Sequence, residues 1–134
     1  MVLKKIKCWA ELRGLVLGVA PVRLFEGGQR AFKWRSERKI ATPFISSCSE
    51  KSCQPSMLYP TARSIIVIAR PNLRSVSPSC PRQGIIANYA LGKDYHHQLK
   101  SCLQELAVIL KGKGAKLAVV QVDKGPLLER EAAY

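Results

Sequence analysis

The most informative stretch of this 134-residue sequence reads Arg63-Ser64-Ile65-Ile66-Val67-Ile68-Ala69, and a proline follows it at position 71. A continuous run of β-branched residues in so short a segment predicts a strand that is buried on both faces. Strands of this kind belong to sheets that are covered by helices. The stretch therefore indicates a layered domain of helices and strands.

Helices are expected before and after this strand in the sequence. Apolar residues at three- and four-residue spacing predict helices over residues 2–13 and 94–111, with Asp94 as the N-cap of the second. Residues 24–38 could form another helix, although Gly27-Gly28 inside it disfavours helical structure. The segments 41–61 and 72–83 are rich in Ser, Pro and Cys or interrupted by proline, which predicts long loops.

Two further strands complete the expected sheet. Short apolar runs over residues 15–20 and 116–122 predict strands, and Pro126 is well placed as the first residue of a last helix. We therefore expect an α/β (α+β) layered domain over residues 1–134. Its core would be a small mixed sheet of about three to four strands flanked by helices.

Composition restricts the class of protein. Hydrophobic residues make up 47% and charged residues 23%, which favours a globular fold over disorder. Lys plus Arg is 22 and Asp plus Glu is 9, so the net charge is +13. This excess favours a polyanionic partner such as nucleic acid, and the alternative is a solvated basic surface with no partner. No apolar run approaches the roughly 18 residues that cross a bilayer, so no membrane association is expected.

The five cysteines favour a reducing compartment. Their odd number and irregular spacing do not fit a disulfide framework, and no pair has the C-x-x-C spacing of zinc or iron–sulfur sites. The N-terminus lacks the apolar region and cleavage site of a secretory signal. We expect a cytoplasmic protein without a metal site of its own.

Several polar residues are candidates for a functional site. Asp123 ends the predicted strand over residues 116–122, at the edge where α/β proteins build sites, and the alternative is that it caps the helix beginning at Pro126. His96-His97 should comprise one packed and one exposed ring rather than a metal site, and Tyr89 and Tyr95 could line a pocket with His96. Two basic clusters could contact phosphates: Arg23, Arg30, Lys33, Arg35, Arg38 and Lys39 form the first, and Arg70, Arg74 and Arg82 the second.

Three segments in order resemble the N-terminal part of epoxyqueuosine reductases. Residues 50–67 (EKSCQPSMLYPTARSIIV) are similar to an E-K-R-x-x-P-x-x-L-L-P-x-A-[RK]-S-I-[IV]-V signature. Residues 89–96 (YALGKDYH) are similar to Y-A-x-G-x-D-Y-H, and residues 122–130 (VDKGPLLER) to V-D-[ST]-G-P-x-L-E-R. The resemblance implies reduction of epoxyqueuosine to queuosine in tRNA, with cobalamin and two [4Fe–4S] clusters as cofactors.

The resemblance also implies roles for three residues. Asp123 matches the proton donor beside the cobalamin, which is chemically sensible because reductive opening of an epoxide leaves a centre that must be protonated. Ser52 occupies the position of a cobalamin-contacting arginine, and Ala87 that of another cobalamin contact. Lys124 replaces a small hydroxyl residue, and Asn88 stands where a basic residue is common.

The family continues into a ferredoxin-like domain whose cysteine-rich motifs are absent from this sequence. The last helix also stops without a cap, so we expect a fragment, a truncated product or one half of a split enzyme, inactive alone unless a partner chain supplies the clusters. Two other hypotheses about the function remain open. One is a non-catalytic basic tRNA-binding module, and the other is a related cobalamin and iron–sulfur reductase such as a reductive dehalogenase.

Overall fold

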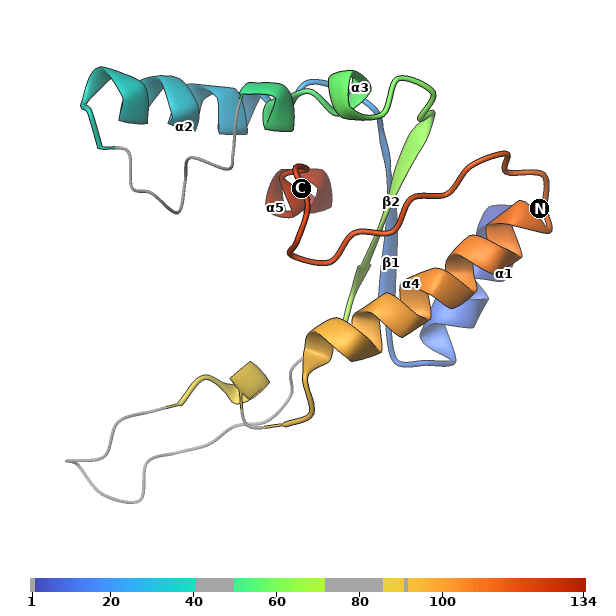
Figure 1. The fold of residues 1–134 in the computed structure, drawn as a ribbon. Coiled ribbons are helices and arrows are strands. Elements are labelled where there is room, and N and C mark those ends of the chain that lie inside the picture. Colours follow the sequence, from blue (N-terminus) through green and yellow to red (C-terminus); the bar gives the residue numbers. More distant parts are fainter. Residues whose placement is uncertain (1, 41–49, 72–85, 91) are drawn as a thin grey trace. The chain divides into compact units, whose positions relative to one another are not determined.

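The computed structural model describes residues 2–40, 50–71, 86–90 and 92–134 (Figure 1). In chain order, the elements of these residues are α1 (Val2–Glu11), β1 (Val16–Pro21), α2 (Glu26–Glu37), the 3₁₀ helix η1 (Glu50–Cys53), α3 (Pro55–Leu58), β2 (Ser64–Ala69), the 3₁₀ helix η2 (Asn88–Ala90), α4 (Tyr95–Lys111) and α5 (Glu129–Ala133). Contacts group the chain into two compact units: residues 1–16 with 68–123, and residues 17–67 with 124–134.

The sheet pairs β1 with β2, and the two strands run antiparallel (Figure 1). The mixed α/β class and the strands expected over residues 15–20 and 63–69 are confirmed, although the inner residues of β2 are half-buried rather than fully buried on both faces. The expected sheet of three to four strands is wrong for the described residues, which form two strands, and residues 116–122 are not a strand. The apolar run there has the right composition, but a strand also needs a neighbouring strand to pair with, and the sheet pairs only β1 with β2 among the described residues. The expected loop over residues 72–83 lies outside the described residues.

Three helix ends share one hydrogen-bond pattern. After α1, Gly14 has φ 64°, and the N–H groups of Gly14 and Leu15 donate to the carbonyls of Glu11 and Ala10. This is the Schellman motif, in which a left-handed residue redirects the chain and satisfies the last carbonyls. The motif recurs after α4 at Gly114, with φ 98°. It also recurs after α2, where the left-handed position is held by Lys39 with φ 52°.

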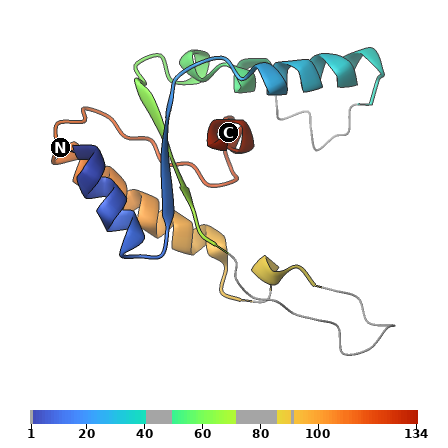
Figure 2. The same ribbon diagram turned by 180° about the vertical axis from the view of Figure 1, so that it is seen from behind.

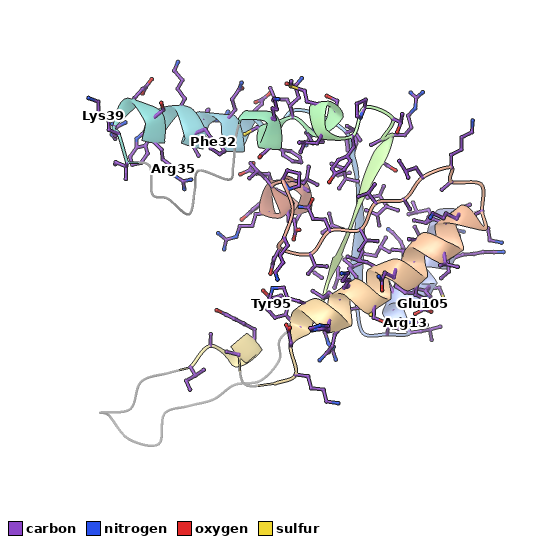
Figure 3. All side chains as sticks on the ribbon, viewed as in Figure 1. Arg13, Phe32, Arg35, Lys39, Tyr95 and Glu105 are labelled. Carbon is purple, nitrogen blue, oxygen red and sulfur yellow. The ribbon has the colours of Figure 1, made fainter. Side chains whose placement is uncertain are left out.

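In the first unit, α1 and α4 lie side by side (Figure 2). The indole N–H of Trp9 on α1 donates to Glu105 Oε1 on α4 at 3.0 Å, and the Arg13 guanidinium forms an ion pair with the same oxygen (Figure 3). Leu106, the next residue of α4, is only 2% exposed. The buried face of α4 and its expected bounds are thereby confirmed.

The second unit has its own core. Phe25, Cys53 and Ala132 are buried together, and the Phe25 N–H donates to the Cys53 carbonyl at 2.8 Å. Gly28 fits this packing because a Cβ there would lie 2.6 Å from Leu128 Cδ1. The glycine pair that disfavours α2 in isolation is therefore compatible with the close approach of the Leu128 side chain.

The last helix begins later than its sequence suggests. It starts at Glu129 with Leu128 as its N-cap, rather than at Pro126. Asp123 lies six residues before the first helical residue, so the interpretation of Asp123 as a helix cap is wrong. Among the described residues, no helix has both the length and the hydrophobicity that a bilayer crossing requires.

Candidate active site

Asp123 is held in an unusual backbone conformation with its side chain accessible. Its φ is 50°, in the left-handed region that aspartate tolerates better than most residues. The side chain is 47% exposed, and both of its hydrogen-bonding neighbours reach the same oxygen, Oδ2. The Tyr95 hydroxyl donates to Oδ2, and His96 Nε2 lies 3.2 Å from it. Among the described residues, both of these contacts are made to Oδ2 and not to Oδ1.

Aromatic rings position these neighbours of Asp123. Tyr95 begins α4 (Figure 3) and stacks on the His96 ring with 4.1 Å between centroids. Tyr89 from η2 meets Tyr95 edge-on at 5.9 Å. The hydrogen bond to Asp123, followed by desolvation, raises the pKa of Tyr95 to about 12, because ionised tyrosine could not donate to a carboxylate. Tyr95 is therefore a stable donor at neutral pH.

Asp94 holds the other side of the His96 ring. As predicted, it is the N-cap of α4, and its side chain accepts the backbone N–H of His96 at 2.9 Å. Its oxygens also lie 2.7 Å from His96 Nδ1 and 2.9 Å from His97 Nδ1. The side-chain and backbone hydrogen bonds from His96 lower the pKa of Asp94 to about 2. Asp94 is therefore an anion throughout the neutral range.

The His96 ring lies between two carboxyl groups. Because Asp94 is ionised, it accepts a hydrogen bond from Nδ1–H of His96. His96 Nε2 then faces Asp123 Oδ2 at 3.2 Å. The pair of His96 and Asp123 therefore has the geometry for proton transfer to a group that approaches Asp123.

The histidine doublet divides as expected. The His96 side chain is 37% exposed and packed on Tyr95, whereas the His97 side chain is 88% exposed. In the part of the chain that the structure describes, no three His, Cys, Asp or Glu side chains are grouped to hold a metal ion.

Ser52 and Ala87 occupy very different surroundings. Ser52 lies in η1 of the second unit and is 0% exposed, so its hydroxyl presents no surface to a cofactor. Ala87 lies in the first unit, is exposed, and accepts the Ala90 N–H at its carbonyl. With one buried hydroxyl and one methyl group, these two residues do not fit a corrin site by themselves. Their cofactor-binding roles stay predictions.

Sequence reasoning singled out Asp123, Tyr95 and His96 but did not connect them. It placed Asp123 at the end of a strand and close to the next helix, and the structure has neither arrangement. It also assigned Asp94 only as a helix cap, although this carboxylate fixes His96 as well. The signal was present in the spacing Asp94-Tyr95-His96, since a cap residue can reach side chains in the first turn that follows it.

Comparison with known proteins identifies similar chains. The family described as "Epoxyqueuosine reductase QueG, DUF1730" matches residues 53–123, more than half of the chain. The epoxyqueuosine reductase of Staphylococcus aureus is 35% identical over 99 residues, covering 69% of this chain and 26% of that protein. The epoxyqueuosine reductase of Gloeobacter violaceus is 38% identical over 75 residues, covering 54% and 23%.

The enzyme of the same description from Xanthomonas campestris matches the longest segment of these three, with 26% identity over 124 residues. That alignment covers 87% of this chain and 35% of the relative. The chain thus spans about a quarter to a third of the length of the curated relatives it matches. No solved structure gives a significant match.

Proposed function

Because the chain belongs to the epoxyqueuosine reductase family, we propose that it takes part in the reduction of epoxyqueuosine to queuosine in tRNA, with Asp123 as the proton donor. The observation that carries this proposal is the exposed Asp123 carboxyl group held at one oxygen by Tyr95 and His96. These residues come from two of the three segments that resemble the family. The net charge of +13 supports a tRNA substrate.

The proposed reaction needs an acid. Removing an epoxide oxygen as water consumes two electrons and two protons, breaks both carbon–oxygen bonds and leaves a carbon–carbon double bond. The oxygen that leaves carbon carries negative charge, and a carboxylic acid within hydrogen-bond distance lowers that cost by donating a proton. Asp123 supplies this proton, and the Tyr95 hydroxyl stabilises the carboxylate that remains. His96 then returns a proton to Asp123 through Nε2.

The two electrons come from a redox cofactor, which the family resemblance implies to be cobalamin reduced through [4Fe–4S] clusters. Reduced cobalamin would supply electrons to the substrate carbon. The buried Ser52 and the methyl group of Ala87 do not fit such a group alone, so Asp123, Tyr95 and His96 act here only on protons. We propose that turnover requires further protein, as the coverage of the relatives suggests.

A second candidate is a non-catalytic tRNA-binding module. It is favoured by the charge of +13 and by the exposed basic residues of α2. The two candidate functions differ in whether the chain needs Asp123 for turnover.

The experiment transfers residues 53–123 of this chain into a full-length epoxyqueuosine reductase and compares it with the same chimera carrying Asp123→Asn. Asparagine tolerates the left-handed backbone and keeps the size of the side chain, so the fold should be unchanged. We expect turnover to fall at least about 100-fold, the usual contribution of a general acid, with tRNA affinity within about twofold. The matched control is Lys116→Gln, an exposed residue of the transferred segment, which should leave turnover nearly unchanged.

Two results would contradict the proposal. Full turnover by the Asp123→Asn chimera would reject the role of Asp123. An inactive unsubstituted chimera that still binds tRNA would favour the non-catalytic module.

A further inference from the structure

Helix α2 carries an exposed tryptophan on the side opposite its packed face. Phe25, Gly28 and Phe32 turn toward the core of the second unit at spacings of three and four residues. With 100° per residue, Trp34 lies about 160–200° around the helix axis from Phe32 and Phe25. Its side chain is half exposed, at 50%. A large aromatic side chain in this position contributes little to the core.

Two arginines flank this ring along the helix. Arg30, Trp34 and Arg38 follow one another at four-residue spacing and so form one stripe, called here the Arg–Trp–Arg stripe. The Arg38 guanidinium carbon lies 4.5 Å from the centre of the Trp34 ring. Among the described residues no carboxylate pairs with Arg38, while Arg30 has an exposed ion pair with Glu26 at 3.6 Å. Lys33, Arg35 and Lys39 add positive charge nearby, the last two visible at the end of α2 in Figure 3.

We propose that the Arg–Trp–Arg stripe binds single-stranded RNA, with an unstacked base on Trp34 and the flanking phosphates on Arg30 and Arg38. Every base offers a flat face to an aromatic ring, and stacking of this kind is strong and tolerant of sequence. The Arg38 guanidinium lies over one face of the ring, where it adds a cation–π contribution and a fork that fits phosphate oxygens, and the base would stack on the other face. The inference rests on the proposed function only in that tRNA is the natural source of such a strand.

An anionic membrane surface fits the stripe less well. Membrane-bound helices place several large apolar residues on one face, so that the face can enter the acyl region. Here Trp34 has only charged neighbours at the positions three and four residues away: Arg30, Glu37 and Arg38, with Ala31 as the one small exception. A single ring between charges suits a base better than a bilayer.

Tryptophan fluorescence of the 134-residue chain tests the contact directly. The chain has two tryptophans, so Trp9→Phe leaves Trp34 as the only indole. We expect single-stranded oligouridine to quench Trp34, and an RNA duplex of equal length to quench it much less. Trp34→Leu should weaken oligouridine binding about tenfold, whereas Trp34→Phe, which keeps a ring, should recover most of the affinity.

The charges are tested by the salt dependence of binding. Arg30→Gln with Arg38→Gln should reduce the slope of log K against log salt by about 1.4, since each phosphate contact on a single strand contributes about 0.7. The matched control is Lys4→Gln with Lys5→Gln on α1, which removes the same charge from another helix and should change the slope much less. Circular dichroism of each variant verifies that the helices persist.

The outcomes separate this inference from the proposed function. Unchanged affinity in Trp34→Leu, with tRNA still bound, overturns the stripe and leaves the proposed function standing. No binding of oligouridine or tRNA overturns both the stripe and the tRNA partner. Quenching by vesicles of phosphatidylserine and phosphatidylcholine but not by oligouridine also overturns the inference.

Discussion

Two helices of this chain carry the same local pair, and the structure gives the pairs different surroundings. Residues 9–13 read WAELR on α1, and residues 34–38 read WRSER at the end of α2. In both, the arginine folds back over the tryptophan four residues earlier, at 4.7 Å for Arg13 and 4.5 Å for Arg38. Glu105 of α4 accepts from both members of the first pair, whereas no described carboxylate reaches the second.

An Arg–Trp pair on a helix therefore has no fixed role. On α1 the pair joins two helices, because the charge of Arg13 is neutralised and the indole N–H is used. On α2 no described carboxylate neutralises Arg38, and the half-exposed ring of Trp34 keeps the face that Arg38 does not cover for a ligand. The proposed RNA contact thus depends on which carboxylates other elements bring near.

Removing the buried side chain next to Glu105 should destabilise the region of the first pair most strongly. Leu106→Ala deletes a nearly fully buried side chain next to Glu105 and should lower the free energy of unfolding by about 3 kcal/mol. Urea denaturation measures this effect. Leu12→Ala, at an exposed position of the chain, is the control and should cost less than about 0.5 kcal/mol. Equal effects of the two substitutions would show that Leu106 is not a core residue.

Removing the shared carboxylate should make the first pair resemble the second. Glu105→Gln leaves Arg13 without its ion pair and should lower stability by about 1 kcal/mol, since the pair is partly exposed. The emission of Trp9 in a Trp34→Phe background should change at the same time. Glu11→Gln on α1 changes the charge equally and should have no effect on Trp9. Unaltered Trp9 emission in Glu105→Gln would contradict the contact.

The helix that carries the second pair can be stabilised at its end. Lys39 holds the left-handed position that glycine holds at Gly14 and Gly114, so Lys39→Gly should relieve backbone strain and stabilise α2 by about 0.5–1 kcal/mol. The control Lys113→Gly removes the same charge where φ is not positive, and should destabilise by a similar amount. Thermal denaturation compares the two, and a loss of stability in Lys39→Gly would contradict the strained conformation.

The N-termini of α4 and α2 should differ slightly in how their stability depends on pH. The pKa of Asp94 falls from 3.8 to about 2 in the folded chain, so its cap stabilises α4 fully above pH 4. This stabilisation is lost as the pH falls through about 2. The N-cap of α2, Phe25, makes no side-chain hydrogen bond and has no such dependence. Amide hydrogen exchange of His96 should accelerate at low pH relative to other residues, and Asp94→Asn should remove this dependence.

Much of the local structure could be predicted from sequence. The run at residues 63–69, the periodicity of residues 94–111 and the turn at Gly14 each depend on neighbours within a few positions, so their patterns are sufficient. The strand predicted over residues 116–122 is wrong, because an apolar run does not by itself fix whether the segment pairs with a neighbouring strand. For the candidate site, the sequence indicated individual residues but not their contacts. Asp123 and His96 were both identified, but their contact joins positions 27 residues apart.

Residue type and spacing along one helix are sufficient for the charge of +13, the capped helix at Asp94 and the two Trp–Arg pairs. Contacts between distant residues are needed for the ion pair of Arg13 with Glu105, for the burial of Ser52 and for the approach of Tyr95 and His96 to one oxygen of Asp123. The physical reason is that electrostatic and hydrogen-bonding partners act over a few ångströms, and only folding brings distant residues within that range.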